Sequence, residues 1–541
     1  MDVAQSIPAA KLEYTGHAPA RAHRPRAALM EGPRPLLSDR ILNFADRHRY
    51  KLFAALVGLY LLGINGHWRL EPDSALYLNI GRNLANGLGY TYHGEAHHLA
   101  FPGLPVMFAG AFKLFHTSRP EPLLGITMLI GAATLGLTYR LFLLHAGRPT
   151  AVLMTFGLGI SRLFYRYCFE LLSDMPFLLG VMAFLVGYEA VFHRREMGEC
   201  DAGAAARARW YDWVLLVGGL ALAVAMRPAM WALLMAIVLA MAWSAIRGPR
   251  RWPQLVGCLA VVGVGILFWK IDPRHAGNYS MGQYEDQLFD STLPHLGLLL
   301  HQMFFEYVPR LFEATLCQAL FGCRLGAGLN TLAGIVVLAV GVSLFWQRPL
   351  WGLWIVMTIA MMLIAVKPLD RYFLEVLPLL VYGWWRGIRW LNWRMGGPWG
   401  NRLFLALFVF GGFTNLCRTG EFVVEQRGVP FLDHYKEGRY ASMDKVARLV
   451  RDHIGPNDWV LAPPKFARIL TFLSHRKAVE PVAQTQLDPA RQAVYVLEPL
   501  DEPVRNWLMQ TEATLGPPIG PVVQSPYDPS PWRLHRVIPH P

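Results

Sequence analysis

The chain has 541 residues, of which 54% are hydrophobic and 16% are charged, whereas an ordinary soluble protein carries about 25% charged residues. Several apolar stretches reach about twenty residues, the length that crosses a hydrocarbon core of about 30 Å. They do not alternate as the strands of a membrane β-barrel do. The composition therefore excludes an ordinary soluble protein and predicts a polytopic α-helical membrane protein.

The net charge of +13 comes from 51 basic and 38 acidic residues. The arginines collect in short segments beside the apolar stretches. Basic residues in that position set the orientation of membrane helices and contact anionic lipid. The charge is therefore not taken as a sign of nucleic-acid binding.

Residues 1–49 are rich in Ala, Pro, Arg and His and show no apolar periodicity, which predicts a disordered N-terminus. Four basic residues directly precede the first apolar stretch at 52–65, and they place the N-terminus in the cytoplasm: Arg40, Arg47, Arg49 and Lys51. The following loop, 66–98, is then extracytoplasmic.

That loop contains the sequence EPDSALYLNIGRNLANGLGYTY, which begins at Glu71. We expect a short interfacial helix from Ser74 to Leu84, with Ser74 as a weak N-terminal cap. Gly87 and Gly89 would end it. On such a helix Asp73 and Tyr77 lie close together.

Further apolar stretches follow and predict a transmembrane domain over 50–419 with roughly eleven to thirteen crossings in all. They lie near 99–115, 123–144, 151–164, 177–192, 213–226, 231–246, 255–269, 325–345, 351–366, 372–385 and 403–416. A polar outer loop over 271–323 interrupts them. The loop with Arg194, Arg195, Arg207 and Arg209 is basic and is expected to be cytoplasmic. Four apolar stretches separate it from the first outer loop, but two loops on opposite sides of a membrane require an odd number. We therefore expect 151–164 to be half-inserted or merged with its neighbour.

Residues 420–541 are of mixed composition and rich in proline. Short apolar runs at 458–462 and 493–497 read as buried strands, and 443–454 reads as a helix. We predict a small α/β domain here. An odd number of crossings would place it outside the membrane, beside the first outer loop.

Asp73 is the first candidate for chemistry, because a carboxylate beside the membrane can act as a general base or a metal ligand. Its alternative is a helix cap or a solvated loop acid. Tyr77, Arg82 and Asn83 add donors that would bind a phosphate or a sugar. Pro72, between Glu71 and Asp73, fixes the local backbone.

Asp174 is the second candidate, in the sequence ELLSDMP at the start of an apolar stretch. An ionisable group at membrane depth is costly and indicates function, although Ser173 or Asp174 would also cap a helix. Arg227 and Arg371 lie at the edges of other apolar stretches. Either would bind a lipid phosphate or simply extend to the interface.

His93, Glu95, His97 and His98 form a further polar group. Zinc sites use His and Glu, but this spacing matches no closed zinc signature, and a solvated loop is the favoured interpretation. No motif indicates a cofactor, and a divalent metal is the one candidate.

The chain resembles the GT-C superfamily of polyprenyl-phosphate-sugar-dependent glycosyltransferases over roughly residues 50–390. It is most similar to the branch with protein O-mannosyltransferases, aminoarabinose transferases and Rgt-type bacterial enzymes. The resemblance rests on an Asp soon after the first apolar stretch and on short motifs in a fixed order: Asp73, Phe101-Pro102-Gly103-Leu104-Pro105, Ser173 to Pro176, Arg227-Pro228, Arg371-Tyr372 and Leu377-Pro378.

The resemblance implies transfer of a sugar, with inversion, from a lipid phosphate at the outer membrane face. It implies that Asp73 is the base or orients the acceptor, that Asp174 is the second acid, and that Arg82, Arg227 and Arg371 hold the donor phosphate. Relatives often have Asp-Glu in the first loop, whereas Ser74 follows Asp73 here. Some have Lys or His directly before a Pro-Pro pair, whereas here His98 lies three residues earlier and the pair is Pro102-Gly103.

The sequence thus predicts an inner-membrane glycosyltransferase of a bacterial cell envelope. Its expected partners are a polyprenyl-phosphate sugar donor, membrane lipids, and a lipid, glycan or protein acceptor. A transporter or flippase for lipid-linked or anionic solutes is the alternative, although internal repeats, which transporters often show, are not seen. A non-catalytic membrane scaffold is the third candidate.

Overall fold

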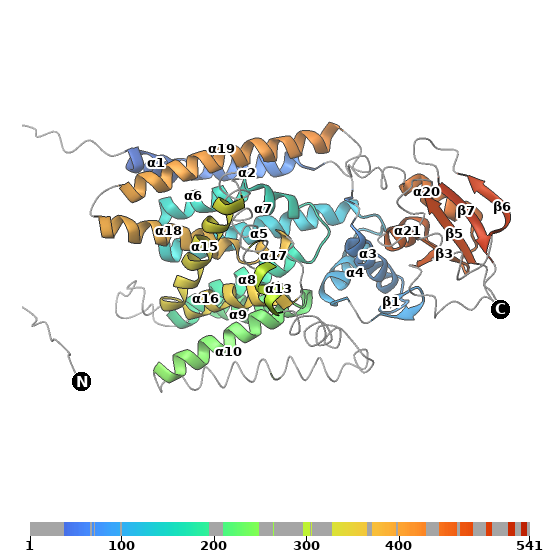
Figure 1. Cartoon of the computed structure of the whole chain (residues 1–541), viewed down its shortest axis with the longest axis horizontal. Coiled ribbons are helices and arrows are strands. Elements are labelled where there is room, and N and C mark those ends of the chain that lie inside the picture. The colour runs from blue at the N-terminus through green and yellow to red at the C-terminus, as the bar shows by residue number, and fades with distance from the viewer. Residues whose placement is uncertain are drawn as a thin grey trace, which may run out of the picture.

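The computed structural model describes residues 37–64, 68–69, 71–97, 100–193, 209–247, 263, 296–302, 305, 327–364, 370–395, 399–428, 443–462, 466–479, 494–499, 518–524 and 532–537. These residues form a large helical part and a smaller part with a β-sheet (Figure 1). The chain segment around α3 (Pro72–Ala85) lies between the two parts. The predicted stretch 255–269 and most of the loop 271–323 lie outside the described residues, as does His98.

The N-terminal segment contains two helices, α1 (Leu37–Arg47) and α2 (Arg49–Leu62). The prediction of disorder up to residue 49 was therefore wrong for 37–49. Ala45 of α1 is buried against Val152 and Leu153, and Asp46 forms an ion pair with Arg148 at 2.6 Å. Leu37, Ile41 and Ala45 recur four residues apart in α1, so this segment carries a helical pattern that the prediction of disorder overlooked.

The first loop forms α3 and a small hairpin of β1 (Thr91–Tyr92) and β2 (Glu95–Ala96). Pro72 is the first helical residue, and Glu71 is the N-cap. The expected cap at Ser74 was wrong, because the Ser74 hydroxyl donates to the Glu71 carbonyl and accepts from the Trp68 indole. Proline at the first helical position starts the helix earlier, since it lacks an N–H that would need a partner.

The helical part continues through helices that mostly overlap the predicted apolar stretches, whereas α13 (Leu296–Gln302) lies in the expected polar loop 271–323. They are α4 (Gly103–Leu114), α5 (Glu121–Ala146), α6 (Arg148–Gly159), α7 (Arg162–Tyr167), α8 (Asp174–Tyr188), η1 (Glu189–His193), α9 (Trp210–Met226), α10 (Met230–Arg247), α13 (Leu296–Gln302), α15 (Ala327–Ser343), η8 (Leu344–Trp346), α16 (Pro349–Ile364), α17 (Asp370–Phe373), α18 (Leu377–Met395) and α19 (Trp399–Gly428).

Two helices of the described chain are long and apolar enough to cross a membrane, namely Glu121–Ala146 and the continuous helix Asp174–Phe192. Four others are apolar but shorter: Gly103–Leu114, Trp210–Met226, Met230–Ser244 and Pro349–Met362. The stretch expected at 151–164 is divided between α6 and α7, and α6 has 12 residues, or about 18 Å. The number of crossings and their parity stay predictions.

The smaller part holds a five-stranded sheet in the order β4-β3-β5-β7-β6. The strands are β3 (Trp459–Leu461), β4 (Lys477–Val479), β5 (Val494–Pro499), β6 (Pro518–Gln524) and β7 (Trp532–Val537). β3 runs parallel to β4 and β5, whereas β7 is antiparallel to β5 and β6. The strands expected at 458–462 and 493–497 correspond to β3 and β5.

Two helices accompany the sheet, α20 (Met443–His453) and α21 (Phe466–Ser474). α21 packs on α3 of the first loop, where Phe472 meets the Trp68 indole edge to face at 5.1 Å between ring centroids. The preceding helix α19 continues to Gly428, so the boundary expected at residue 420 falls inside a helix. One hydrophobic cluster runs from the helical part into α20 and α21.

Candidate active site

Asp73 lies in the first turn of α3 and contacts two arginines from distant parts of the chain. Arg371 of α17 is 3.3 Å from its Oδ2, and Arg468 of α21 is 3.2 Å from its Oδ1. The Asp73 side chain is 40% exposed, so substrate can reach it. α3, α17 and α21 thus bring one carboxylate and two guanidinium groups together where the helical part meets the sheet part (Figure 1).

A second charged group lies buried in the helical part. Arg227, which directly follows α9, contacts Asp174 at the start of α8 at 2.5 Å and Glu375 at 3.1 Å. All three side chains are at most 9% exposed. Asp174 is the first residue of α8. Its side chain forms an ion pair with Arg227, whereas the alternative interpretation was a cap of the helix.

Tyr372 and Tyr77 connect the two charged groups. The Tyr372 ring lies 5.2 Å from the Arg227 guanidinium and 5.3 Å from that of Arg371. Burial raises the pKa of Tyr77 to about 12, with the Asp73 carboxylate as the second cause. The Tyr77 phenol therefore stays protonated at neutral pH and can donate a hydrogen bond to an anion.

The structure therefore brings together five residues that the sequence selected, namely Asp73, Tyr77, Asp174, Arg227 and Arg371. Together with Glu375 and Arg468 the group holds three carboxylates and three guanidiniums. Its formal charge is zero before substrate binds.

Arg82 and Asn83 do not contact Asp73. Arg82 donates to Asn79 and to the carbonyl of Phe472, and it contacts His475 at 2.8 Å. The Asn83 amide donates to Thr91. Asp73 and Arg82 are nine residues apart, which at about 100° per residue puts them on opposite faces of α3. Helical periodicity thus separates Arg82 from Asp73, and its expected role at the donor phosphate stays a prediction.

Sequence reasoning missed Glu375 and Arg468. Glu375 lies in the apolar run RYFLEVLPLL, and an acid in such a run is a functional signal by itself. Arg468 is one basic residue in the amphipathic segment FARILTFLS. No local pattern distinguishes it from an ordinary surface arginine, because its partner Asp73 is 395 residues away.

A metal site does not emerge from the described residues, where no three His, Cys, Asp or Glu side chains are placed to hold an ion. The nearby carboxylates face guanidinium groups instead. Of the predicted polar group, His93 lies in the β1–β2 turn and stacks near Tyr92. The carboxylates of the candidate site are therefore engaged in ion pairs with arginines.

Comparison with solved structures identifies the fold. No model of a known protein family matches the sequence, and no curated protein sequence matches it significantly. The chain is similar to ArnT, the aminoarabinose transferase, from Cupriavidus metallidurans, with 14% identity to the apo structure over 90% of this chain and 97% of that one. The TM-score is 0.52.

The structure of the same protein bound to undecaprenyl phosphate gives a TM-score of 0.53 at 13% identity, again over 90% and 97% of the two chains. A weaker likeness, with a TM-score of 0.48 at 14% identity, is to an Archaeoglobus fulgidus oligosaccharyltransferase, over 79% of this chain and 62% of that one. The chain shares the fold of ArnT, as the resemblance to GT-C enzymes in its sequence predicted.

Proposed function

We propose that the chain is a membrane glycosyltransferase that moves a sugar from a polyprenyl-phosphate donor to a lipid, glycan or protein acceptor at the outer face of the cytoplasmic membrane. The observation that carries the proposal is the accessible Asp73 carboxylate between Arg371 and Arg468. A base beside two cations suits the transfer of a sugar from a phosphate. The ArnT structure with undecaprenyl phosphate supports a donor of this lipid class.

The reaction balances without a redox partner. The acceptor hydroxyl oxygen forms a bond to the anomeric carbon of the sugar, and the bond from that carbon to the phosphate oxygen breaks. The phosphate leaves with the bonding electron pair, and the hydroxyl proton passes to the Asp73 carboxylate. Attack from the side opposite the phosphate inverts the anomeric carbon. Asp73 thus acts as general base.

Two anions, the Asp73 carboxylate and the donor phosphate, compete for Arg371 and Arg468 during this reaction. Before the donor binds, both contact Asp73. A donor phosphate competes for them with charge-assisted hydrogen bonds of the same kind, and its binding frees the carboxylate for the acceptor hydroxyl. The same cations then stabilise the charge that develops on the leaving phosphate. Donor binding and activation of the base are thereby coupled.

The buried group supports this site. Asp174 and Glu375 both form ion pairs with the Arg227 guanidinium. Arg227 in turn lies near Tyr77 and, through the Tyr372 ring, near Arg371. We assign Asp174 a positioning role through Arg227, and Tyr77 a hydrogen bond to the donor phosphate.

The test is a transfer assay with purified protein in lipid, a panel of radiolabelled polyprenyl-phosphate sugars, and a membrane extract as the acceptor source. Asp73→Asn should lower transfer by about 10²–10⁴-fold, the contribution typical of general acid–base catalysis. The matched control is Asp46→Asn, which removes a carboxylate from another ion pair, with Arg148, and should keep full activity.

Equal transfer by wild type and Asp73→Asn would remove Asp73 from the mechanism. If no donor supports transfer but labelled lipid crosses the bilayer, the transporter class replaces the enzyme. A scaffold would keep its cellular activity in the Asp73→Asn variant.

A further inference from the structure

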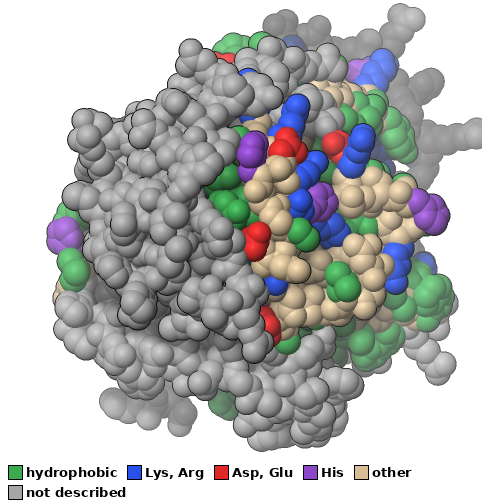
Figure 2. Space-filling view, turned by 90° about the vertical axis from the view of Figure 1, so that its right-hand side faces the viewer, with side chains coloured by type: hydrophobic (Ala, Val, Ile, Leu, Met, Phe, Trp, Pro, Cys, Tyr) green, Lys and Arg blue, Asp and Glu red, His purple; other side chains and the backbone are tan. Residues whose placement is uncertain are grey.

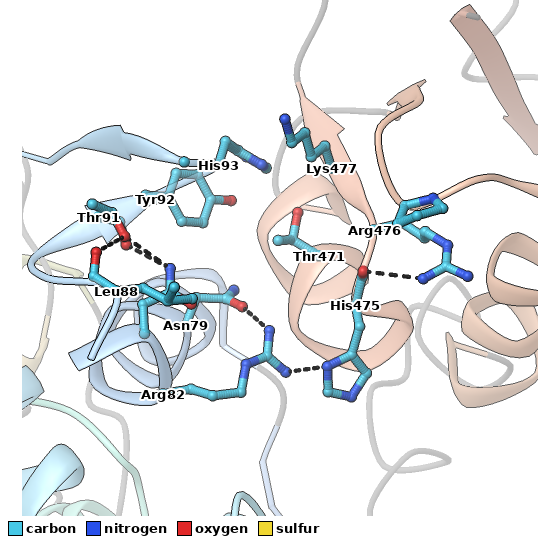
Figure 3. A pocket seen from close by; sticks show the side chains of 13 residues that line it. Asn79, Arg82, Leu88, Thr91, Tyr92, His93, Thr471, His475, Arg476 and Lys477 are labelled. Atoms are coloured by element: carbon cyan, nitrogen blue, oxygen red, sulfur yellow. Dashed lines mark hydrogen bonds between the residues drawn. The ribbon is translucent and has the colours of Figure 1, made fainter. Parts of the chain in front are cut away.

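A polar pocket of about 300 Å³ lies on the face of α3 that points away from Asp73. Its walls come from α3, from the β1–β2 hairpin, and from the end of α21 with β4 (Figure 3). This volume is at the lower end of the range for small-molecule sites, about 300–1,000 Å³. It is distinct from the Asp73 site, although α3 and α21 contribute to both.

The pocket is basic. Arg82, Arg476 and Lys477 line it together with His93 and His475, and none of its lining residues is an acid. Figure 2 shows several basic side chains on the described part of this end of the molecule, with acidic side chains beside them. The cations reach the pocket from both parts of the chain, as the sticks in Figure 3 show.

The structure shows no carboxylate partner for these three cations within the described chain. Arg82 contacts Asn79, His475 and a carbonyl. Arg476 donates to carbonyls alone. The Lys477 ammonium lies 5.2 Å from the centroid of the Trp459 ring. The Arg476 guanidinium is held by carbonyls of α20 and its neighbourhood, which leaves Arg82 and Lys477 as the cations on two walls of the cavity. Their positive charges repel each other, and an anion in the cavity would offset that cost.

Two histidines whose backbones are strained add hydrogen-bonding groups to the pocket. His93 and His475 have φ angles of 58° and 59°, two of the three left-handed residues other than glycine that the described residues contain. Among the described residues, the buried Nδ1 atom of His93 has no hydrogen-bond partner. Strain of this kind gathers at ligand sites, where the surroundings hold it in place.

We propose that this pocket binds an anionic sugar unit of the acceptor, one that carries a phosphate or a carboxylate. The inference rests on the proposed transferase function and names its acceptor class as an acidic glycan. Asp73 lies in the first turn of α3, and Arg82 follows nine residues later, a distance of about 13 Å along the helix. The anionic unit and the attacking hydroxyl therefore belong to different sugar units of one acceptor.

Direct binding tests this proposal without any donor. The full chain in neutral phosphatidylcholine nanodiscs is titrated with glucose 6-phosphate, glucuronic acid, glucose and inorganic phosphate in a calorimeter. We expect at least one of the two acidic sugars to bind ten times more tightly than glucose. Lys477→Gln should weaken that binding about tenfold, the effect of losing one charge-assisted bond, and Lys477→Arg should restore it.

The matched control is Lys113→Gln, which removes an exposed lysine from the last turn of α4 and should leave binding unchanged. Thermal midpoints of all variants show whether each is folded. Equal binding of glucose and the acidic sugars, or no effect of Lys477→Gln in a folded protein, would overturn the proposal. Inorganic phosphate binding as tightly as both acidic sugars would overturn the assignment to a sugar.

The same titration in Asp73→Asn separates this inference from the proposed function. Intact binding beside lost transfer supports both statements. If the wild-type protein transfers label normally but does not bind the acidic sugars, the pocket assignment alone is overturned.

Discussion

At the scale of single residues, the arrangement around Asp73 depends on arginines that serve two anions in turn. Arg371 comes from the helical part and Arg468 from the sheet part. Each contacts a different oxygen of the carboxylate, so displacement of either one by a phosphate leaves the other in place. Arg468 is 37% exposed and Arg371 is 23% exposed, which makes Arg468 the more accessible to an arriving donor.

Arg468→Gln should therefore lower transfer by about 10²–10³-fold, the loss seen when one donor to a developing charge is removed. The effect should appear mainly in kcat if the cation acts on the leaving phosphate, and Arg468→Lys should recover part of it. Steady-state kinetics with varied donor measures both constants. Unchanged kcat in Arg468→Gln, with the exposed Arg119→Gln as control, would contradict this role.

Arg227→Met should destabilise the fold by about 3–5 kcal/mol, because it leaves two buried carboxylates without their cation. Adding Asp174→Asn and Glu375→Gln removes those charges and should restore most of the lost stability. Chemical unfolding in detergent measures each variant. If the single and triple variants unfold alike, Arg227 does not neutralise the two acids.

The individual residues were largely predictable from the sequence, but their neighbours were not. Asp174, Arg227 and Arg371 each lie at the end of an apolar stretch, where an ionisable side chain is conspicuous, and Asp73 lies in the polar loop that follows the first apolar stretch. Their pairing spans up to 298 residues, as between Asp73 and Arg371, and no local pattern encodes such a distance. The same holds for Arg468.

At the scale of elements, α3 works through two faces. One carries Asp73 and Tyr77 toward the charged groups, and the other carries Asn79 and Arg82 toward α21. The helical repeat of 3.6 residues fixes this division. Because that repeat can be counted along the sequence alone, the separation of Arg82 from Asp73 was predictable from residue spacing.

The close packing of α8 against α9 gives a prediction at this scale. A Cβ atom on Gly187 of α8 would lie 2.4 Å from the Leu216 nitrogen and 2.7 Å from the Asp212 carbonyl oxygen of α9. Small residues allow such close backbone approach between membrane helices. Gly187→Ala should cost about 1–3 kcal/mol through overpacking.

Gly218→Ala on α9 is the matched control, because no described residue lies within 4 Å of a Cβ atom there. It should be neutral or slightly stabilising, since alanine favours helix. Thermal unfolding of the two variants in the same detergent decides the point. Equal midpoints would show that α8 and α9 can separate without loss.

At the scale of the whole molecule, the two parts meet through α3, α21 and the hairpin. The elements of the sheet part were predictable because strands and helices have local signals. Its docking was not, since the contacts that position it join residues far apart in the sequence, such as Trp68 with Phe472 and Arg82 with the Phe472 carbonyl. This junction carries both the Asp73 site and the basic pocket, so its integrity governs both.

Acid should weaken this junction. Burial lowers the pKa of His475 to about 4, with Arg82, Arg451 and Arg476 adding to the effect, and burial with Lys477 lowers the pKa of His93 to about 3. An unfolded histidine has a pKa of about 6.5. Below that value the unfolded chain binds more protons, so the stability is present above about pH 6.5 and is lost as pH falls toward 4.

The thermal midpoint of the full chain should therefore drop steadily from pH 7 to pH 4.5, and limited proteolysis should cut between the two parts sooner. The double variant His93→Asn/His475→Asn should flatten this dependence, because asparagine tolerates the left-handed backbone at both positions and has no charge to gain. Asparagine at position 93 would be followed by Gly94, and an Asn-Gly pair favours the two-residue turn of this hairpin. A double variant that loses stability with acid as steeply as wild type would show that other groups control the junction.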